Sequence, residues 1–339
     1  MTAEKQMKVG ILGAGTWGVT LARLLCRKGC SVTVWSALPE EVAYLSETRV
    51  HKNLKEMRIP EGVEFTCDIA CACAGMGAVV FAVPSVYMRA TAGKAAPFLT
   101  SDQVIVSVAK GFEKDTLDTM SHILEETLGN ASRIAALSGP THAEEVAVDL
   151  PTVIVSASAD PSCARFVQEL FSTEVLRVYT NDDILGVELC GAIKNIIALA
   201  AGISEGLGYG DNTKAALITR GIAEMTRLGE AMGCKQTTFM GLAGIGDLVV
   251  TATSRHSRNN RAGYLIGKGM TASEATKEVG MVVEGLNALE GAVRLAEKNG
   301  VEMPIINAVD EIVNRNADPR ESVSRLMNRE KKNEFRIRV

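Results

Sequence analysis

A lysine and an asparagine interrupt an otherwise apolar stretch of the sequence. Lys194 and Asn195 lie within residues 189–203, where nearly every other side chain is apolar or very small. An ammonium group is rarely buried without a partner, because desolvating it is costly. On a helix, Cys190 and Gly191 would lie one turn before Lys194 and leave room beside it, while apolar walls would lower its pKa toward the range useful for proton transfer. We therefore predict that Lys194 transfers a proton and that Asn195 orients a hydroxyl or carbonyl. In the alternative, Lys194 extends to solvent or pairs with a distant acid.

Three further groups of polar residues could complete such a site. Asp247 lies in the apolar segment GLAGIGDLVV and is the acidic partner we expect for Lys194. Lys110 follows the strand-like run QVIVSV, where a solvated lysine would be out of place, although a surface loop is the alternative. The segment SRHSRNNR supplies arginine and hydroxyl donors suited to a phosphate monoester, or else forms a solvated basic loop. The cluster consists of Arg255, Arg258, Asn259 and Arg261.

The sequence VGILGAGTWG contains a glycine pattern typical of dinucleotide binding. Gly13, Gly15 and Gly18 have the spacing G-x-G-x-x-G, follow a predicted strand and open a predicted helix. This context provides a tight turn, a close approach of the backbone to a pyrophosphate, and a helix N-terminus directed at its charge. Together with Lys194 and the phosphate-type cluster, it indicates hydride transfer at a secondary alcohol that carries a phosphate.

The residue after the second predicted strand bears on the choice of coenzyme. An acidic residue there would hold the ribose 2′-hydroxyl of NAD, and an arginine would accommodate the 2′-phosphate of NADP. The strand SVTVW is instead followed by Ser36 and Ala37, and Glu40 and Glu41 come several residues later. The sequence therefore predicts NAD or NADP as coenzyme, with the preference open.

The elements that must position these residues divide the chain into two parts. Up to about residue 181, short β-branched runs alternate with helical segments, which predicts a Rossmann-like α/β domain with a doubly wound, mostly parallel sheet. From about residue 182 the segments are long, rich in Ala, Leu, Met and Glu, and have helical spacing. We predict a dinucleotide-binding domain over 1–181 and an all-helical substrate-binding and catalytic domain over 182–339. The predicted strands are 7–12, 31–35, 78–83, 103–108, 133–137, 152–157 and a last strand ending at Thr180.

Composition narrows the class of protein. The 339 residues have 47% hydrophobic content and a net charge of −4, so no basic field attracts nucleic acid. The eight cysteines lack the spacing of a zinc site and are predicted to be reduced, with no metal. An opening without an apolar signal segment, and no uncharged run long enough for a membrane span, favour a cytoplasmic protein without stable membrane association.

Five longer motifs carry a family resemblance. They are GAGTWG, AKGFE, SGPTHAEEVA, AIKNIIALAAGISEGLGYGDNTKAALITRG and GLAGIGDLVVTATSRHSRN, in this order between residue 8 and about residue 315. This set resembles the bacterial-type NAD(P)-dependent glycerol-3-phosphate dehydrogenases. The resemblance implies reversible interconversion of sn-glycerol 3-phosphate and dihydroxyacetone phosphate, which supplies glycerophospholipid synthesis, and it favours a homodimer.

The resemblance also implies roles for individual residues. Lys194 would be the proton acceptor, with Lys110, Asn195 and Asp247 around the reacting carbon. Substrate contacts would come from Gly139 and Thr141, and the phosphate would be held by Ser257, Arg258 and Asn259. The cofactor would contact Thr16, Trp17, Lys110, Ala143, Arg258, Val282 and Glu284 in addition to the glycine turn and Ser36.

The sequence departs from this family at two positions. Ser36 and Ala37 stand where a basic residue is common, and His142 stands where phenylalanine is common, a change that we expect to alter packing only. Two other functions remain as alternatives. One is a related β-hydroxyacid dehydrogenase that acts on a carboxylate, against which the phosphate-type cluster argues. The other is a non-catalytic dinucleotide sensor, which would not need Lys194.

Overall fold

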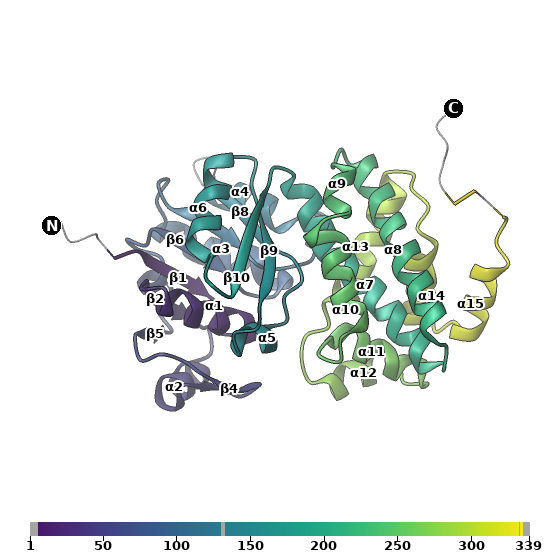
Figure 1. Cartoon of the computed structure of the whole chain (residues 1–339), viewed down its shortest axis with the longest axis horizontal. Helices are drawn as coiled ribbons and strands as arrows, with labels where there is room; N and C mark the ends of the chain where they lie inside the picture. Colours follow the sequence, from purple (N-terminus) through teal and green to yellow (C-terminus); the bar gives the residue numbers. More distant parts are fainter. Residues whose placement is uncertain (1–5, 130–132, 332, 335–339) are drawn as a thin grey trace.

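The computed structural model describes residues 6–129, 133–331 and 333–334, and one large sheet forms the centre of its first half (Figure 1). Within these residues the sheet has eight strands in the order β10-β9-β8-β7-β6-β1-β2-β5, and β3 pairs separately with β4. Neighbouring strands of the large sheet run parallel except β8 and β9, which pair antiparallel. The strands are β1 (Lys8–Leu12), β2 (Ser31–Trp35), β3 (Val50–His51), β4 (Leu54–Arg58), β5 (Val63–Thr66), β6 (Ala78–Phe81), β7 (Val104–Ser107), β8 (Arg133–Ser138), β9 (Thr152–Ala157) and β10 (Leu176–Asn181).

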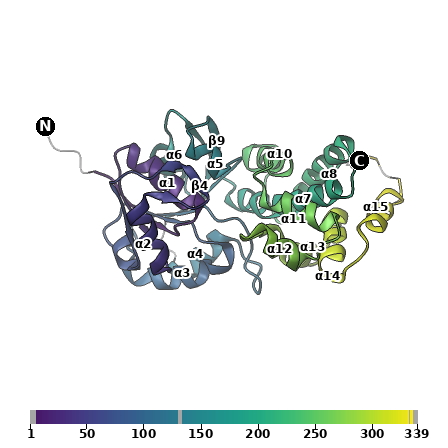
Figure 2. The same cartoon turned by 90° about the horizontal axis from the view of Figure 1, so that it is seen from below.

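Helices cover both faces of this sheet because alternate strand residues are apolar on both sides. Val9 and Ile11 of β1 pack with α1 and α6, whereas Leu12 and Phe81 pack with α3 and α4 on the other face. Figure 2 shows these two pairs of helices on opposite sides of the sheet. The helices of this half are α1 (Thr16–Arg27), α2 (Pro39–Thr48), α3 (Met88–Ala95), α4 (Met120–Leu128), α5 (Ala143–Ala147) and α6 (Pro161–Phe171).

The predicted α/β fold with a mostly parallel sheet is confirmed, and each predicted strand has a counterpart. The prediction missed β3, β4 and β5, whose sequences VH, LKEMR and VEFT include several charged residues. It also did not specify that β9 and β10 run opposite to the rest of the sheet. Strand direction depends on the connection between strands and is not encoded in a local run of β-branched residues.

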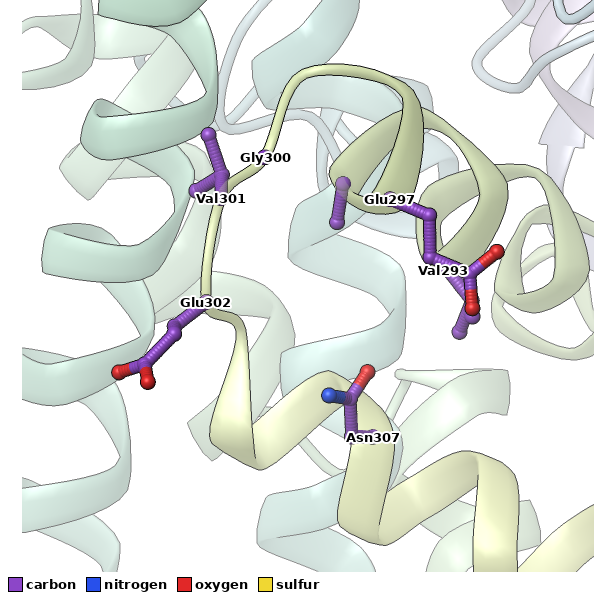
Figure 3. Close-up of a pocket in the computed structure, with 7 residues that line it drawn as sticks. Val293, Glu297, Gly300, Val301, Glu302 and Asn307 are labelled. Carbon is purple, nitrogen blue, oxygen red and sulfur yellow. The ribbon is translucent and has the colours of Figure 1, made fainter.

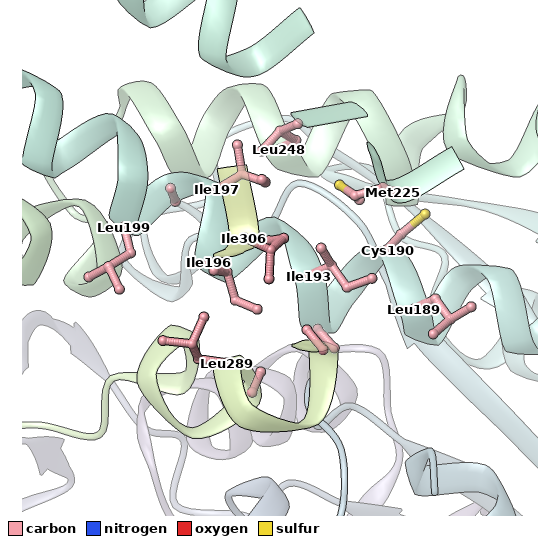
Figure 4. Packing of buried hydrophobic residues seen from close by; sticks show 14 of the residues in the cluster. Leu189, Cys190, Ile193, Ile196, Ile197, Leu199, Met225, Leu248, Leu289 and Ile306 are labelled. Carbon is pink, nitrogen blue, oxygen red and sulfur yellow. The ribbon is translucent and has the colours of Figure 1, made fainter. Parts of the chain in front are cut away.

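The second half of the described chain is helical and is assembled around α7 (Figure 1). Nearly all of α7 is buried, and Figure 4 shows Ile193, Ile196 and Ile197 among apolar side chains of other helices. This helix is long and apolar enough to cross a membrane, but 89% of its most apolar window is buried inside the protein. The helices are α7 (Ile184–Gly206), α8 (Asp211–Ala231), α9 (Gln236–Phe239), a π-helical turn (Leu242–Gly246), α10 (Asp247–Thr253), α11 (Arg258–Gly267), α12 (Ala272–Val279), α13 (Glu284–Lys298), α14 (Pro304–Arg315) and α15 (Pro319–Met327).

Glycines allow α11 to lie directly against α7. A Cβ atom added at Gly202 of α7 would collide with the carbonyl of Asn260, and one at Gly263 of α11 would collide with the carbonyl of Leu199. Backbone packing this close is possible only without side chains at the contact. It fixes the start of α11, with the polar residues of the SRHSRNNR segment, beside the centre of α7.

Candidate active site

The glycine turn between β1 and α1 has the geometry that a dinucleotide requires. Gly13 has φ +124°, and an added Cβ would lie 2.6 Å from the carbonyl oxygen of Ala82, so only glycine fits. A Cβ at Gly18 would collide with the carbonyl of Gly13, which brings α1 close to the sheet. By contrast, a Cβ at Gly15 would meet nothing within 4 Å. The open space beside Gly15, at the N-terminus of α1, fits a pyrophosphate group.

A buried ion cluster joins the two halves of the protein. Lys194 Nζ donates hydrogen bonds to Asp247 Oδ1 and, at 2.7 Å, to Thr251 Oγ1. Lys110 Nζ donates to the other carboxylate oxygen, Asp247 Oδ2, at 2.6 Å and to the carbonyl of Gly139 at 3.1 Å. One carboxylate, 1% exposed, is thus shared by two ammonium groups. The predicted pairing of Lys194 with Asp247 is present.

The elements that carry this cluster explain how its residues meet. Lys110 and Gly139 follow β7 and β8, which are parallel neighbours and therefore end at the same edge of the sheet. Lys194 lies in the middle of α7, and Asp247 is the first residue of α10, where a helix N-terminus stabilises negative charge. When Lys194 is protonated, the cluster carries a net charge of +1 and so favours an anionic ligand.

Burial and charge set the protonation of the cluster. Burial is the main cause that lowers the pKa of Lys194 to about 7; the carboxylate of Asp247 opposes this shift and the ammonium of Lys110 adds to it. Burial alone would raise the pKa of Asp247, but the two ammonium groups hold it below its ordinary value. An ammonium group has three N–H donors, and two of those on Lys194 are taken by Asp247 and Thr251. Lys194 can therefore exchange a proton near neutral pH with an oxygen atom bound beside it.

Two asparagine side chains link α7 to α11 and α13. Asn195 Nδ2 donates to the carbonyl of Gly191 at 3.1 Å, and Asn195 Oδ1 accepts a hydrogen bond of 2.9 Å from Asn259 Nδ2. Asn259 Oδ1 in turn accepts from the N–H of Gly285 at 2.8 Å. Both side-chain carbonyls are therefore engaged within the protein. Each amide nitrogen has two N–H groups and uses one of them among the described residues, so the other is open to a ligand.

The N-terminus of α11 presents groups suited to an anion. Ser257 is the N-cap, and its Oγ accepts a hydrogen bond from the N–H of Asn260 at 3.2 Å, which leaves the hydroxyl hydrogen for a ligand. The exposed Arg258 is the first residue of the helix, where the helix dipole also attracts negative charge. Nearby, Ser85 Oγ donates to Glu284 Oε2 at 3.0 Å, so the loop after β6 meets the start of α13. Burial raises the pKa of Glu284, and the charge of Arg258 opposes this rise.

The structure places the remaining predicted residues around the same edge of the sheet. Thr141 Oγ1 donates to the carbonyl of Gly139 at 3.1 Å. The others are placed by position: Thr16 and Trp17 in the first turn of α1, Ser36 directly after β2, Ala143 at the start of α5, and Val282 just ahead of α13.

His142 packs against a second histidine. Its ring centroid lies 5.9 Å from that of His256, and its Nε2 is buried without a hydrogen-bond partner among the described residues. Burial lowers the pKa of His142, and the charge of Lys194 lowers it further. That this residue alters packing only stays a prediction.

Sequence reasoning missed Thr251. This residue contacts the Lys194 ammonium, and its signal was its position one helical turn after Asp247. Threonine is a common residue type, so only its spacing from a better-marked residue could have identified it.

Another cavity, of about 250 Å³, lies between α13 and α14 (Figure 3). Its charged lining residues are Glu297 and Glu302, and its other lining residues include Val293, Val301 and Asn307. None of the predicted site residues lines this cavity.

Comparisons with known proteins match both halves of the chain to one family. Residues 8–164 match the N-terminal region of NAD-dependent glycerol-3-phosphate dehydrogenase, and residues 183–324 match its C-terminal region. A glycerol-3-phosphate dehydrogenase [NAD(P)+] of Lactobacillus delbrueckii subsp. bulgaricus is 60% identical over 334 residues, which cover 97% of this chain and 99% of the relative. One from Agathobacter rectalis is 50% identical, over 96% and 97% of the two chains. The crystal structure of a glycerol-3-phosphate dehydrogenase from Coxiella burnetii superimposes with a TM-score of 0.92 at 38% identity, over 96% and 99% of the chains.

Proposed function

The chain belongs to the NAD-dependent glycerol-3-phosphate dehydrogenase family, and on that premise we propose that Lys194 exchanges a proton with the secondary alcohol of the substrate. The enzyme reversibly interconverts sn-glycerol 3-phosphate and dihydroxyacetone phosphate, with NAD or NADP as coenzyme. The observation that carries the proposed mechanism is the buried cluster in which Asp247 holds Lys194 and Lys110 together at the carboxyl edge of the sheet.

In the proposed mechanism Lys194 acts as a general acid and base. In the direction of oxidation, neutral Lys194 takes the proton of the C2 hydroxyl; in reduction, its ammonium group returns a proton to the carbonyl oxygen. Lys110 donates its third N–H to the same oxygen, because negative charge develops there during the reaction. Asp247 keeps both ammonium groups in place, and the apolar walls of α7 keep water away from Lys194.

The remaining predicted residues would hold the two ligands. The phosphate of the substrate would bind Ser257, Arg258 and the free N–H of Asn259, with Gly139 and Thr141 beside the rest of the molecule. The dinucleotide would lie over the glycine turn, with its pyrophosphate beside Gly15, and would contact Thr16, Trp17, Ser36, Ala143, Val282 and Glu284. When bound, the nicotinamide supplies or accepts the hydride.

A direct assay tests this function. Purified protein is mixed with dihydroxyacetone phosphate and either NADH or NADPH, and in parallel with a 3-hydroxy acid and either NAD+ or NADP+. The absorbance of the reduced coenzyme is followed in each mixture. We expect turnover with at least one coenzyme, and no oxidation of a 3-hydroxy acid. Oxidation of the hydroxy acid without turnover of dihydroxyacetone phosphate would identify a carboxylate dehydrogenase. Coenzyme binding without turnover of either compound would identify a sensor.

The assembly and location of the enzyme are further parts of the proposal. We place the boundary between the two domains at residues 181 and 182, where β10 ends shortly before α7 begins. The exposed apolar side chains of Met240, Ile245 and Val249 support a homodimer, which sedimentation can test. All eight cysteines lie among the described residues and are free, which supports a reducing, cytoplasmic location.

A further inference from the structure

The structure brings an acidic side chain back to the end of β2. Gly13 N–H donates a hydrogen bond of 2.8 Å to the carbonyl of Trp35, the last residue of β2, so the glycine turn lies directly beside the end of this strand. The next residue, Ser36, is buried, and its N–H donates to the carbonyl of Thr66 at 3.1 Å. Ser36 is therefore fixed between the glycine turn and β5.

A short turn carries Glu41 back to this point. Ser36 Oγ donates a hydrogen bond to Glu41 Oε2 and accepts one from the N–H of Leu38 at 3.2 Å. The turn thus spans the five positions that separate the two residues in sequence. Glu41 belongs to the first turn of α2, where a carboxylate is favoured by the helix dipole. The acidic residue that seemed to come too late in the sequence is joined to the end of β2.

We propose that Glu41, held by Ser36, makes this enzyme select NAD(H) over NADP(H). In a dinucleotide-binding fold, a carboxylate at the end of the second strand accepts a hydrogen bond from the ribose 2′-hydroxyl, whereas NADP enzymes place an arginine nearby for the 2′-phosphate. A 2′-phosphate beside Glu41 would face a charge of the same sign, and a hydroxyl would find an acceptor. This inference rests on the proposed function only for the use of a nicotinamide coenzyme.

Among the described residues, Glu41 forms no ion pair with the cationic side chains that follow it in the chain. His51 lies near enough for the Glu41 charge to raise the pKa of His51, but burial, the larger cause, lowers it, so the imidazole is neutral at neutral pH. Lys52 lies over the ring of Tyr44, with Nζ 5.0 Å from the ring centroid. Arg49 donates to the carbonyl of Val63 and pairs with Glu61. Of these groups, Arg49 has a carboxylate partner and Lys52 an aromatic one.

Direct binding measurements on the complete chain test the proposal without any substrate. The two tryptophans, Trp17 and Trp35, flank the glycine turn, so their fluorescence reports coenzyme binding. For the wild type we expect the Kd of NADPH to exceed that of NADH by about tenfold or more. Glu41→Gln keeps an acceptor for the hydroxyl but removes the charge. It should therefore lower the Kd of NADPH about tenfold and change that of NADH by less than about threefold.

Two other variants distinguish an effect on coenzyme selectivity from a general effect on folding. Glu40→Gln is the matched control, because Glu40 is an exposed neighbour in the same helical turn that is not bonded to Ser36, and it should leave the ratio of the two Kd values unchanged. Ser36→Ala releases the Glu41 carboxylate and should reduce the ratio partly. The proposal is overturned if wild type binds NADPH as tightly as NADH. It is also overturned if Glu41→Gln changes both Kd values equally, as a purely structural role would require. Failure of the proposed function would instead leave coenzyme binding normal and abolish turnover of dihydroxyacetone phosphate.

Discussion

Two charged residues on α7, six positions apart, illustrate different uses of a buried charge. Glu188 accepts hydrogen bonds from the N–H of Ser121 at 2.8 Å and from its hydroxyl at 2.6 Å, and so completes the N-terminus of α4. Lys194 contacts the charged Asp247 and the hydroxyl of Thr251, and it keeps one N–H free. Glu188 is enclosed by groups that belong to the fold, whereas Lys194 lies beside the space where substrate binds in the proposed mechanism.

Glu224 on α8, like Glu188, is a buried carboxylate that accepts hydrogen bonds from the N-terminus of another helix. Its carboxylate accepts hydrogen bonds of 2.9 and 3.1 Å from the N–H of Ile305, and it is also within reach of the N–H of Ile306, at the start of α14. Burial raises the pKa of Glu224 to about 7, and these hydrogen bonds oppose the rise. Buried charges that cap helices should therefore affect stability, and the charge of Lys194 should affect catalysis.

The largest expected effect is that of Lys194→Ala. Loss of the general acid and base should lower kcat/KM by about 10³-fold or more. Asp247 keeps Lys110 as its partner, so the variant should fold and bind NADH, which circular dichroism and tryptophan fluorescence can establish. Lys214→Ala on α8, where the lysine pairs with Glu205, is the matched control and should retain activity. Near-normal kcat in Lys194→Ala would refute the role of this lysine.

A smaller effect, of a different kind, is expected for Glu224→Ala. Two buried N–H groups at the start of α14 would lose their acceptor, which should reduce the free energy of unfolding by about 1–3 kcal/mol. Turnover should change by less than about twofold, since the site is elsewhere. Glu230→Ala, at an exposed residue in the last turn of the same helix, should leave both unchanged. Chemical denaturation measures the free energy of unfolding, and steady-state kinetics measures turnover. If Glu224→Ala lost activity without losing stability, Glu224 would not have the purely structural role assigned to it.

The pH dependence of the free energy of unfolding also tests the structural role of Glu224. Because the pKa of Glu224 is raised in the folded state, its protonated form stabilises the protein at low pH. That contribution should be lost as the pH rises through about 7, so Glu224→Ala should flatten the fall in stability between about pH 4.5 and pH 7.

The sequence predicted much of this architecture and the centre of its site. β-branched runs identified the strands of the large sheet except β5, and the glycine pattern identified the dinucleotide turn. Lys194 and Asp247 could be paired in advance because each interrupts an apolar segment. That Asp247 also binds Lys110, which is 137 residues away in the sequence, depends on how the two halves pack and has no local signal.

Some functional and structural residues could not be identified from the sequence because their surroundings depend on how the chain folds. Glu188 and Glu224 lie in helices, where glutamate is a common surface residue, so their burial is a tertiary effect. Glu41 was set aside because of its distance from β2 in the sequence, and only the turn at Ser36 and Leu38 removes that distance.

The measurement that tests the central claim most directly is the pH dependence of kcat/KM in both directions of the reaction. Burial lowers the pKa of Lys194 to about 7. Reduction of dihydroxyacetone phosphate requires the protonated form, so kcat/KM for it should fall about tenfold per pH unit above 7. Oxidation of glycerol 3-phosphate requires the neutral form and should rise with pH to a plateau above 7. Profiles that bend in the same direction, or that stay flat through this range, would contradict a mechanism in which Lys194 carries the proton.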